Sequence, residues 1–144
     1  MKILVVHGPN LNLLGTRELS IYGEGTLDDV NTVISAEAER LGIEVDIHQT
    51  AREGAIIEFL HSGIGQVDGA ILNPAAYSHT SRAVADALRA VPYPVVEVHL
   101  TNIHAREEWR RTSVTAEAAH GVIAGFGPTS YALALHALKS ILEG

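Results

Sequence analysis

The chain contains no cysteine among its 144 residues. That absence excludes disulfide bonds, thiolate catalysis, and zinc or iron–sulfur sites held by cysteine. Basic residues are also scarce: ten Lys and Arg face 17 Asp and Glu, which gives a net charge of −7 with neutral histidine. A nucleic-acid-binding protein needs a basic surface to neutralise phosphates, so this balance argues against nucleic acid as a partner. An anionic ligand would have to be met by a local group of cations.

Long apolar runs are missing too. No segment approaches the roughly 18 consecutive apolar residues of a membrane-spanning helix. The first residues, MKILVVH, have the pattern of a strand rather than of a cleavable signal. We therefore expect a cytoplasmic protein without membrane contact. A length of 144 residues, with 47% hydrophobic and 19% charged residues, fits a single domain that covers residues 1–144.

Short apolar runs alternate with segments of helical periodicity along the whole chain. The runs are typical of buried parallel strands and cover residues 3–7, 43–48, 69–72, 95–100 and 122–124. Helical patterns cover residues 27–41, 55–60, 81–91 and 131–142; Thr26 and Asp29 cap the first, and Gly42 ends it. This alternation predicts an α/β fold, a flavodoxin-like, doubly wound, five-stranded parallel sheet of strand order 2-1-3-4-5 with helices on both faces.

In a sheet of this order, ligands bind beyond the carboxyl ends of the central strands, where the strand order reverses. Four polar residues stand at those ends. They are Asn10 after the first strand, Asn73 after the third, and Glu97 with His99 at the end of the fourth. We take these residues as the first candidates for a site.

Residues 8–25 form an unusually long connection between the first strand and the first helix, and they include four glycines with Asn10, Arg17 and Tyr22. Loops of this length are often lids over a binding site. A plain structural connector is an equally good interpretation from the residues alone. A phosphate-binding loop is a weaker one, because the first hydroxyl is that of Thr16.

Arg17 lies five residues before Tyr22, so its guanidinium could stand beside the phenol if the loop folds back. A nearby cation lowers the pKa of a phenol, and phenolate is a stronger base than a carboxylate, which suits it to a weakly acidic carbon-bound proton. The alternative is that Tyr22 packs at the loop rim and Arg17 is solvated.

Glu97 and His99 occupy alternate positions of one strand, so their side chains point to the same face. Two polar side chains on an apolar central strand are costly unless satisfied, so we predict a functional pair; a histidine satisfied within the core is the other possibility. After the third strand, NPAAYSHTS places Asn73 and His79 before a helix that the neighbouring hydroxyl residues can cap.

The segment REEWRR, residues 106–111, gathers positive charge in an acidic chain. Glu107 and Arg111 have the spacing of a helix salt bridge, and Trp109 is expected to pack against the protein. Arg110 could instead donate to hydroxyl or carboxylate oxygens of a ligand.

Taken in order, these segments resemble the type II 3-dehydroquinase family. The motifs are HGPNLNLLGTRE with YG, ILNPAAYSHTS, PVVEVHLTNIHAREEWRRTS, and GVIAGFG with SYALAL, and they span nearly the whole chain. The resemblance implies a flavodoxin-like enzyme that dehydrates 3-dehydroquinate to 3-dehydroshikimate in the shikimate pathway, without metal, nucleotide or other cofactor. It also implies a homo-oligomer, a dodecamer built as a tetramer of trimers.

The resemblance further implies catalytic roles for five residues. Tyr22 matches the family's general base, with Arg17 holding it ionised, and Asn10 would bind a water that stabilises the enolate. His99 matches the general acid, and Glu97 would orient its ring.

Substrate binding is implied for a second set, which consists of Asn73, His79, Asp86, Leu100, Thr101 and Arg110. Asn73 and the backbone amides of residues 100 and 101 resemble a carboxylate site, while His79 and Arg110 resemble contacts to ring hydroxyls. Asp86 resembles a residue that reaches the site of a neighbouring subunit.

The chain departs from the family pattern at three places. Thr50, Ala51 and Arg52 stand where Ser-Asn is usual after Gln, Thr101 stands where serine is common, and Ser130 stands where glycine is usual. None of these changes removes an implied catalytic group. Arg52 could shift the preference towards a relative of dehydroquinate.

Two other functions compete with this one. A flavodoxin-like binding module would use the loop as a partner or nucleotide surface, but the chain lacks a hydroxyl-rich phosphate loop and an acidic cluster. A metal-dependent hydrolase would use Glu97, His99 and His104, yet no HxxxH helical pair accompanies them.

Overall fold

The computed structural model describes all 144 residues and contains a five-stranded parallel sheet of order β2-β1-β3-β4-β5. The predicted strand order is confirmed, and each predicted strand is found within one residue of its expected ends. The strands are β1 (Lys2–His7), β2 (Glu44–Gln49), β3 (Gly69–Asn73), β4 (Val95–His99) and β5 (Gly121–Ala124).

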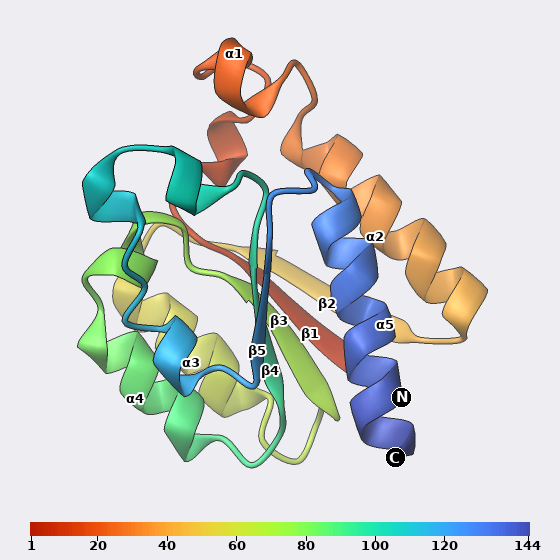
Figure 1. Ribbon diagram of the computed structural model, residues 1–144. Helices are drawn as coiled ribbons and strands as arrows, with labels where there is room; N and C mark the ends of the chain where they lie inside the picture. The colour runs from red at the N-terminus through yellow and green to blue at the C-terminus, as the bar shows by residue number, and fades with distance from the viewer.

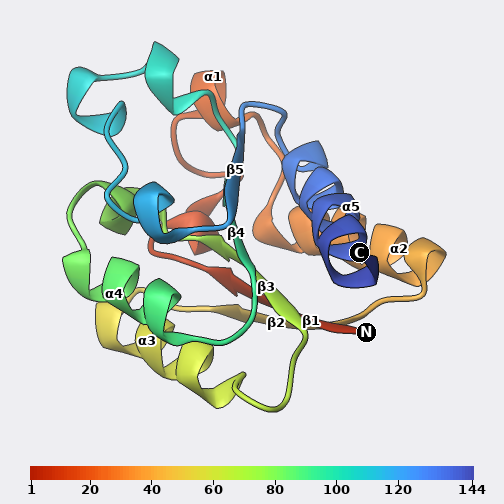
Figure 2. The same ribbon diagram turned by 60° about the horizontal axis from the view of Figure 1, so that its bottom comes forward.

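Helices cover both faces of this sheet, as predicted (Figure 1). One face carries α2 (Leu27–Leu41) and α5 (Thr129–Glu143), and the other carries α3 (Glu53–Ser62) and α4 (Arg82–Ala90). Figure 2 shows the same two layers after a rotation, with the sheet between them. None of the helices is both long and apolar enough to cross a bilayer.

The central strands bury side chains on both faces, which explains their continuous apolar sequences. On β1, Ile3 and Val5 face α2 and α5, whereas Leu4 and Val6 face α3 and α4. All four side chains are at most 3% exposed. The same alternation turns the side chain of His7, the last residue of β1, towards α2 and α5.

The connection between β1 and α2 is more structured than its sequence indicates. It contains a 3-10 helix, η1 (Leu11–Leu13), and a short α-helix, α1 (Leu19–Tyr22), neither of which the apolar pattern predicted. Leu11 and Leu14 are buried in the core beside α2, whereas α1 buries no residue. The first half of the connection is thus anchored, and the second half projects beyond the carboxyl end of the sheet (Figure 1).

Helix α2 begins with the predicted capping box. The Thr26 hydroxyl accepts a hydrogen bond from the Asp29 N–H, and the Asp29 carboxylate accepts one from the Thr26 N–H. Gly42 ends the helix with a left-handed φ of 71°, a conformation that glycine adopts without steric cost.

His7, at the end of β1, is fully buried on the α2 and α5 face. Its Nδ1 lies 2.9 Å from the hydroxyl of Tyr131 on α5, and its Nε2 lies 2.8 Å from Oδ1 of Asn31 on α2. Burial lowers the pKa of His7 from 6.5 to about 4, an effect that the hydrogen bond to Asn31 only partly opposes. The imidazole is therefore neutral at neutral pH.

The capping box gives a first prediction, because Thr26→Ala removes one half of it. We expect the free energy of unfolding to fall by about 1 kcal/mol, which corresponds to a melting temperature lower by about 3 °C. Calorimetry measures the shift. Thr32→Ala is the matched control, since Thr32 is exposed within α2 and only donates to the Asp28 carbonyl; an equal loss in both variants would contradict the capping role.

Burial of a neutral His7 gives a second prediction, on pH. The unfolded chain binds a proton at His7 below pH 6.5, whereas the folded chain binds it only near pH 4, so the folded state loses stability as the pH falls through this window. The expected loss is about 2 kcal/mol by pH 5. Urea unfolding at pH 7 and pH 5 measures it.

His7→Asn should lack this part of the acid destabilisation. His61→Asn, which removes an exposed histidine of α3, should keep the parental dependence. A parental pH dependence in His7→Asn would show that His7 does not carry the effect.

Candidate functional site

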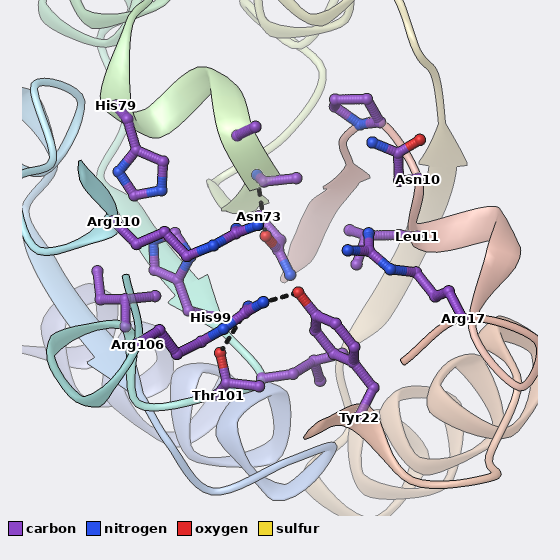
Figure 3. A pocket seen from close by; sticks show the side chains of 15 residues that line it. Asn10, Leu11, Arg17, Tyr22, Asn73, His79, His99, Thr101, Arg106 and Arg110 are labelled. Atoms are coloured by element: carbon purple, nitrogen blue, oxygen red, sulfur yellow. Dashed lines mark hydrogen bonds between the residues drawn. The ribbon is translucent and has the colours of Figure 1, made fainter. Parts of the chain in front are cut away.

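A pocket of about 520 Å³, its open mouth included, lies at the carboxyl end of the sheet. It sits beyond β1, β3 and β4, where a sheet of this order is expected to bind ligands. Figure 3 shows the side chains that converge there. Of the eleven residues singled out from the sequence, nine line the pocket: Asn10, Arg17, Tyr22, Asn73, His79, His99, Leu100, Thr101 and Arg110.

The lining is cationic although the chain is acidic. Three arginines, Arg17, Arg106 and Arg110, reach the pocket, and no Asp or Glu belongs to its lining. Since the net charge of the chain is −7, this is the local group of cations that an anionic ligand would need. A small carboxylated ligand fits both the charge and the size of the pocket.

Tyr22, at the end of α1, stands between two of these guanidinium groups. Cζ of Arg17 lies 4.6 Å from the centre of the phenol ring, and Cζ of Arg106 lies 5.0 Å from it. The hydrogen bond to the phenol oxygen comes from Arg106, whose Nη1 is 2.5 Å from Tyr22 Oη (Figure 3). Arg17 thus approaches the ring as expected, but Arg106 is the residue that contacts its oxygen.

Arg106 was not among the candidate residues, although REEWRR begins with it. Its side chain is only 9% exposed and also donates to Glu18 Oε2 at 3.2 Å, while its Nε is buried without a partner. Residues 22 and 106 are far apart in the chain; Tyr22 ends a helix of four residues, and Arg106 lies in an irregular segment. A periodic pattern could not show that they meet.

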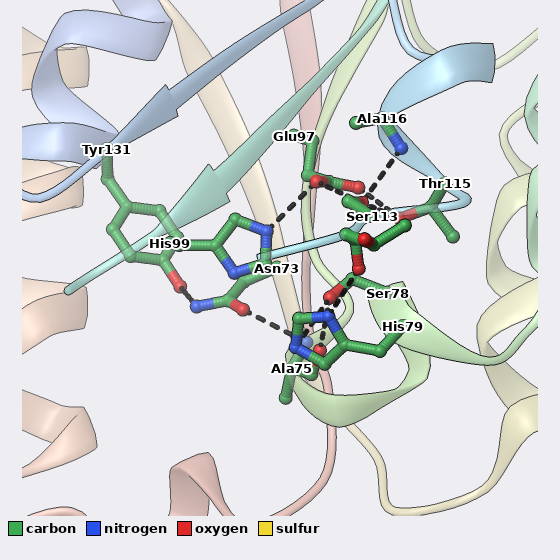
Figure 4. Close-up of polar contacts among 11 residues, drawn as sticks. Asn73, Ala75, Ser78, His79, Glu97, His99, Ser113, Thr115, Ala116 and Tyr131 are labelled. Atoms are coloured by element: carbon green, nitrogen blue, oxygen red, sulfur yellow. Dashed lines mark hydrogen bonds and ion pairs between the residues drawn. The ribbon is translucent and has the colours of Figure 1, made fainter. Parts of the chain in front are cut away.

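Glu97 and His99 form the predicted pair on β4 (Figure 4). His99 Nε2 lies 2.9 Å from Glu97 Oε2, and because a carboxylate only accepts, Nε2 carries the hydrogen. The other ring nitrogen, Nδ1, is the one left for the pocket. Glu97 is fully buried and His99 is 5% exposed, so this pairing fixes the ring.

Glu97 receives two further hydrogen bonds, from residues that were not among the candidates. Ser113 Oγ donates to Glu97 Oε2 at 2.9 Å, and the hydroxyl of Thr115 donates to Oε1. A buried carboxylate is costly unless donors surround it. These three donors satisfy it, and they tie the segment that follows Arg110 to the sheet.

Asn73, at the end of β3, is 3% exposed and held through both ends of its amide. Oδ1 accepts from the Ala75 N–H at 3.1 Å, and Nδ2 donates to Tyr131 Oη at 3.0 Å (Figure 4). One N–H of the amide remains for a ligand. The backbone N–H groups of Leu100 and Thr101 likewise have no acceptor within the protein, so three donors are open at this side of the pocket.

His79 and Arg110 form the opposite wall of the pocket, and Trp109 lies against both outside the lining. His79 Nδ1 donates to the Thr112 carbonyl at 2.7 Å, and burial is the main cause that lowers the pKa of His79. Trp109 is 53% exposed, but it packs against two side chains: the Arg110 guanidinium lies 4.1 Å from its ring centre, and the His79 ring meets it edge-on at 5.1 Å.

The prediction of a salt bridge between Glu107 and Arg111 was wrong. Glu107 pairs with Arg110 instead, with 2.5 Å between its Oε2 and Arg110 Nε. The reason is local geometry: residues Glu108–Arg110 form a 3-10 helix, in which side chains three residues apart lie on the same side.

Several residues named from the sequence lie elsewhere. Asp86 is exposed on α4, and Arg52 is exposed at the start of α3, outside the pocket. Ser130 is buried, and its hydroxyl accepts a hydrogen bond from the Phe126 N–H, so it serves the turn before α5. No three His, Asp or Glu side chains converge on a point that could hold a metal ion.

Comparison with known proteins places these features in a family. The family model described as Dehydroquinase class II matches residues 1–139. The chain is 51% identical to the 3-dehydroquinate dehydratase of Clostridium acetobutylicum over 99% of both chains. It is 54% identical to that of Geotalea daltonii over 96% of both.

Solved structures agree with the sequence relatives. The type II dehydroquinase of Butyrivibrio crossotus matches with a TM-score of 0.94 and 41% identity, over 96% of this chain and 97% of that one. The type II dehydroquinase of Propionibacterium acnes matches with a TM-score of 0.92 and 42% identity over 96% of each chain. Family membership, which the motifs predicted, is confirmed: the chain belongs to the dehydroquinase class II family.

Proposed function

We propose that this protein dehydrates 3-dehydroquinate to 3-dehydroshikimate by anti elimination through an enolate. One observation carries the proposal. A small cationic pocket brings together a phenol in contact with guanidinium groups, an imidazole oriented by a buried carboxylate, and a group of open N–H donors. The substrate is a carboxylated ring with a ketone and hydroxyl groups. The phenol can act on the carbon next to the ketone, the imidazole on the departing hydroxyl, and the N–H donors on the carboxylate.

Proton abstraction falls to Tyr22. The Arg106 guanidinium at its oxygen and Arg17 at its ring stabilise a phenolate. That phenolate takes the proton from the carbon next to the ketone, and the electron pair moves onto the ketone oxygen as an enolate. A water bound to Asn10, which lines the same pocket, donates to that oxygen, a preorganised contact that stabilises the developing charge.

Loss of the hydroxyl falls to His99. Its Nε2–H is engaged by Glu97, so the proton for the leaving group comes from Nδ1 of the doubly protonated ring. The negative carboxylate of Glu97 stabilises that cation and holds its plane. When the enolate reforms the ketone, the carbon–oxygen bond breaks, the hydroxyl leaves as water, and a conjugated enone remains.

Binding uses the remaining groups. The Asn73 amide and the N–H groups of Leu100 and Thr101 hold the substrate carboxylate, because all three offer donors without internal acceptors. His79 and Arg110 contact ring hydroxyls from the opposite wall. His79 does so through Nε2, since its Nδ1 hydrogen is given to Thr112.

Four further properties are predicted from the sequence and its family resemblance: a role in the shikimate pathway, a cytoplasmic location, independence of any cofactor, and assembly as a dodecamer of four trimers. The position of Asp86 supports an assembly in one respect. It lies exposed on α4, away from the pocket of its own subunit, so it can act on a substrate only in a neighbouring subunit.

Ultraviolet absorbance tests the reaction, because the enone product absorbs and the substrate does not. With 3-dehydroquinate and chelator present throughout, we expect product from the parent, and a fall in kcat of at least about 100-fold in Tyr22→Phe and in His99→Ala. Each variant removes one of the two proton-transfer groups.

Tyr93→Phe is the matched control, because it removes another tyrosine hydroxyl, one that donates to the Leu60 carbonyl away from the pocket. Its kcat should stay near the parental value. A folded parent that gives no absorbance rise would favour the binding module, and inactivation by chelator would favour the metal-dependent hydrolase.

Mixed oligomers test the role of Asp86. If Asp86 completes a neighbouring site, Asp86→Ala and Tyr22→Phe subunits are each impaired alone, yet random mixing in equal amounts restores about a quarter of the parental activity, from pairs that combine both intact residues. Co-expression with two affinity tags yields such oligomers. Activity equal to the mean of the two separate variants would contradict the sharing of sites.

A further inference from the structure

His7 and Tyr131 do not line the pocket, yet both connect to Asn73, which does. His7 and Asn73 are register partners on the neighbouring strands β1 and β3. Both side chains reach the α2 and α5 face, where the Tyr131 hydroxyl contacts each of them. All three residues are at most 3% exposed, so water has little access to their hydrogen bonds.

The backbone of Ala75 fixes the direction of this chain of hydrogen bonds. The Ala75 N–H can only donate, so the Asn73 atom beside it must be the oxygen. Asn73 Nδ2 then donates to Tyr131 Oη, and the Tyr131 hydrogen is left for His7 Nδ1. Nε2 of His7 therefore carries the ring hydrogen and donates to Asn31 Oδ1.

The opposite orientation of the Asn73 amide is strongly disfavoured. It would set an NH2 group against the Ala75 N–H and leave a buried amide oxygen to compete for the Tyr131 hydrogen, so His7 would lose its donor. Buried donors without acceptors are costly, and a fully satisfied chain is rigid for the same reason. Ala75 itself has a left-handed φ of 52°, which alanine keeps only where its surroundings hold it.

The orientation matters because the two ends of an amide have opposite polarity. As held, Asn73 offers its second Nδ2 hydrogen to the pocket. Rotated, it would offer a carbonyl oxygen, which repels a carboxylate. We propose that Tyr131 and His7 are positioning residues of the substrate carboxylate site, which lock the Asn73 amide with its free N–H towards the ligand; this deepens the proposed dehydratase function and rests on it.

Tyr131→Phe tests this assignment by removing one oxygen atom and keeping the ring. We expect the KM for 3-dehydroquinate to rise about tenfold while kcat stays within about twofold, because the carboxylate contact is the same in the ground and transition states. Tyr93→Phe, the same change at a buried hydroxyl in the other helix layer, should leave KM unchanged. A similar KM in Tyr131→Phe and the parent would overturn the proposal.

A double-mutant cycle separates positioning from a general loss of stability. If Tyr131 acts through Asn73, Tyr131→Phe should change KM by less than about twofold once Asn73→Ala is present. An undiminished tenfold effect in the Asn73→Ala background would contradict action through Asn73.

The protonation of His7 provides a test that needs no variant. In 15N-histidine-labelled protein at neutral pH, the His7 ring should be the Nε2–H tautomer; an Nδ1–H tautomer would reverse the chain and overturn the proposal even if Tyr131→Phe does not fold. Failure of the parent to convert 3-dehydroquinate would instead overturn the proposed function, and with it the carboxylate role of Asn73. Conversion by the parent with an unchanged KM in Tyr131→Phe would overturn only the positioning.

Discussion

The site depends on one buried charge, the carboxylate of Glu97. It has no exposed surface on the central strand β4, where an unpaired charge would be very costly. It is satisfied by His99 from its own strand and by the hydroxyls of Ser113 and Thr115 from the segment that leads to β5. Satisfying the charge therefore also fixes the His99 ring and anchors the far end of the segment that carries Arg106 and Arg110.

The two faces of the sheet hold different residues of the pocket in place. Glu97 and His99 share the α3 and α4 side of β4 with Val95, whereas His7 and Asn73 meet Tyr131 on the α5 side. His99 and Asn73, the proposed acid and the proposed carboxylate contact, thus depend on different helix layers and on different buried hydrogen-bond networks. This division follows from the alternation of side chains along parallel strands, since neighbouring strand ends can turn polar groups to either layer.

Much of this arrangement could be predicted because it rests on periodic structure. The elements follow from apolar periods of two and 3.6 residues, and the strand order from their alternation along the chain. The capping box of α2 follows from Thr26 and Asp29 three residues apart, and the pairing of Glu97 with His99 from the period of a strand. The contact between Arg106 and Tyr22 could not be predicted in this way, because α1 is too short to show a period, Arg106 lies in an irregular segment, and only the fold brings them together. For the same reason Ser113 and Thr115 were missed, and Arg111 rather than Arg110 was expected to pair with Glu107. Tyr131 lies on a predicted helix, but its contacts to His7 and Asn73 are tertiary and leave no periodic signal.

The connection that carries Tyr22 is held in two different ways. Its first half inserts Leu11 and Leu14 into the core, whereas no residue of α1 is fully buried and only Tyr22 packs, partly buried, against the core. Glu18 makes one contact to Arg17 and another to Arg106, at 3.3 and 3.2 Å, and such partly exposed ion pairs contribute little individually. Displacing α1 would therefore uncover little apolar surface apart from that against Tyr22, whereas Leu11 and Leu14 hold the start of the connection in place. A loop that closes over a ligand in the pocket and opens to release it would need both properties.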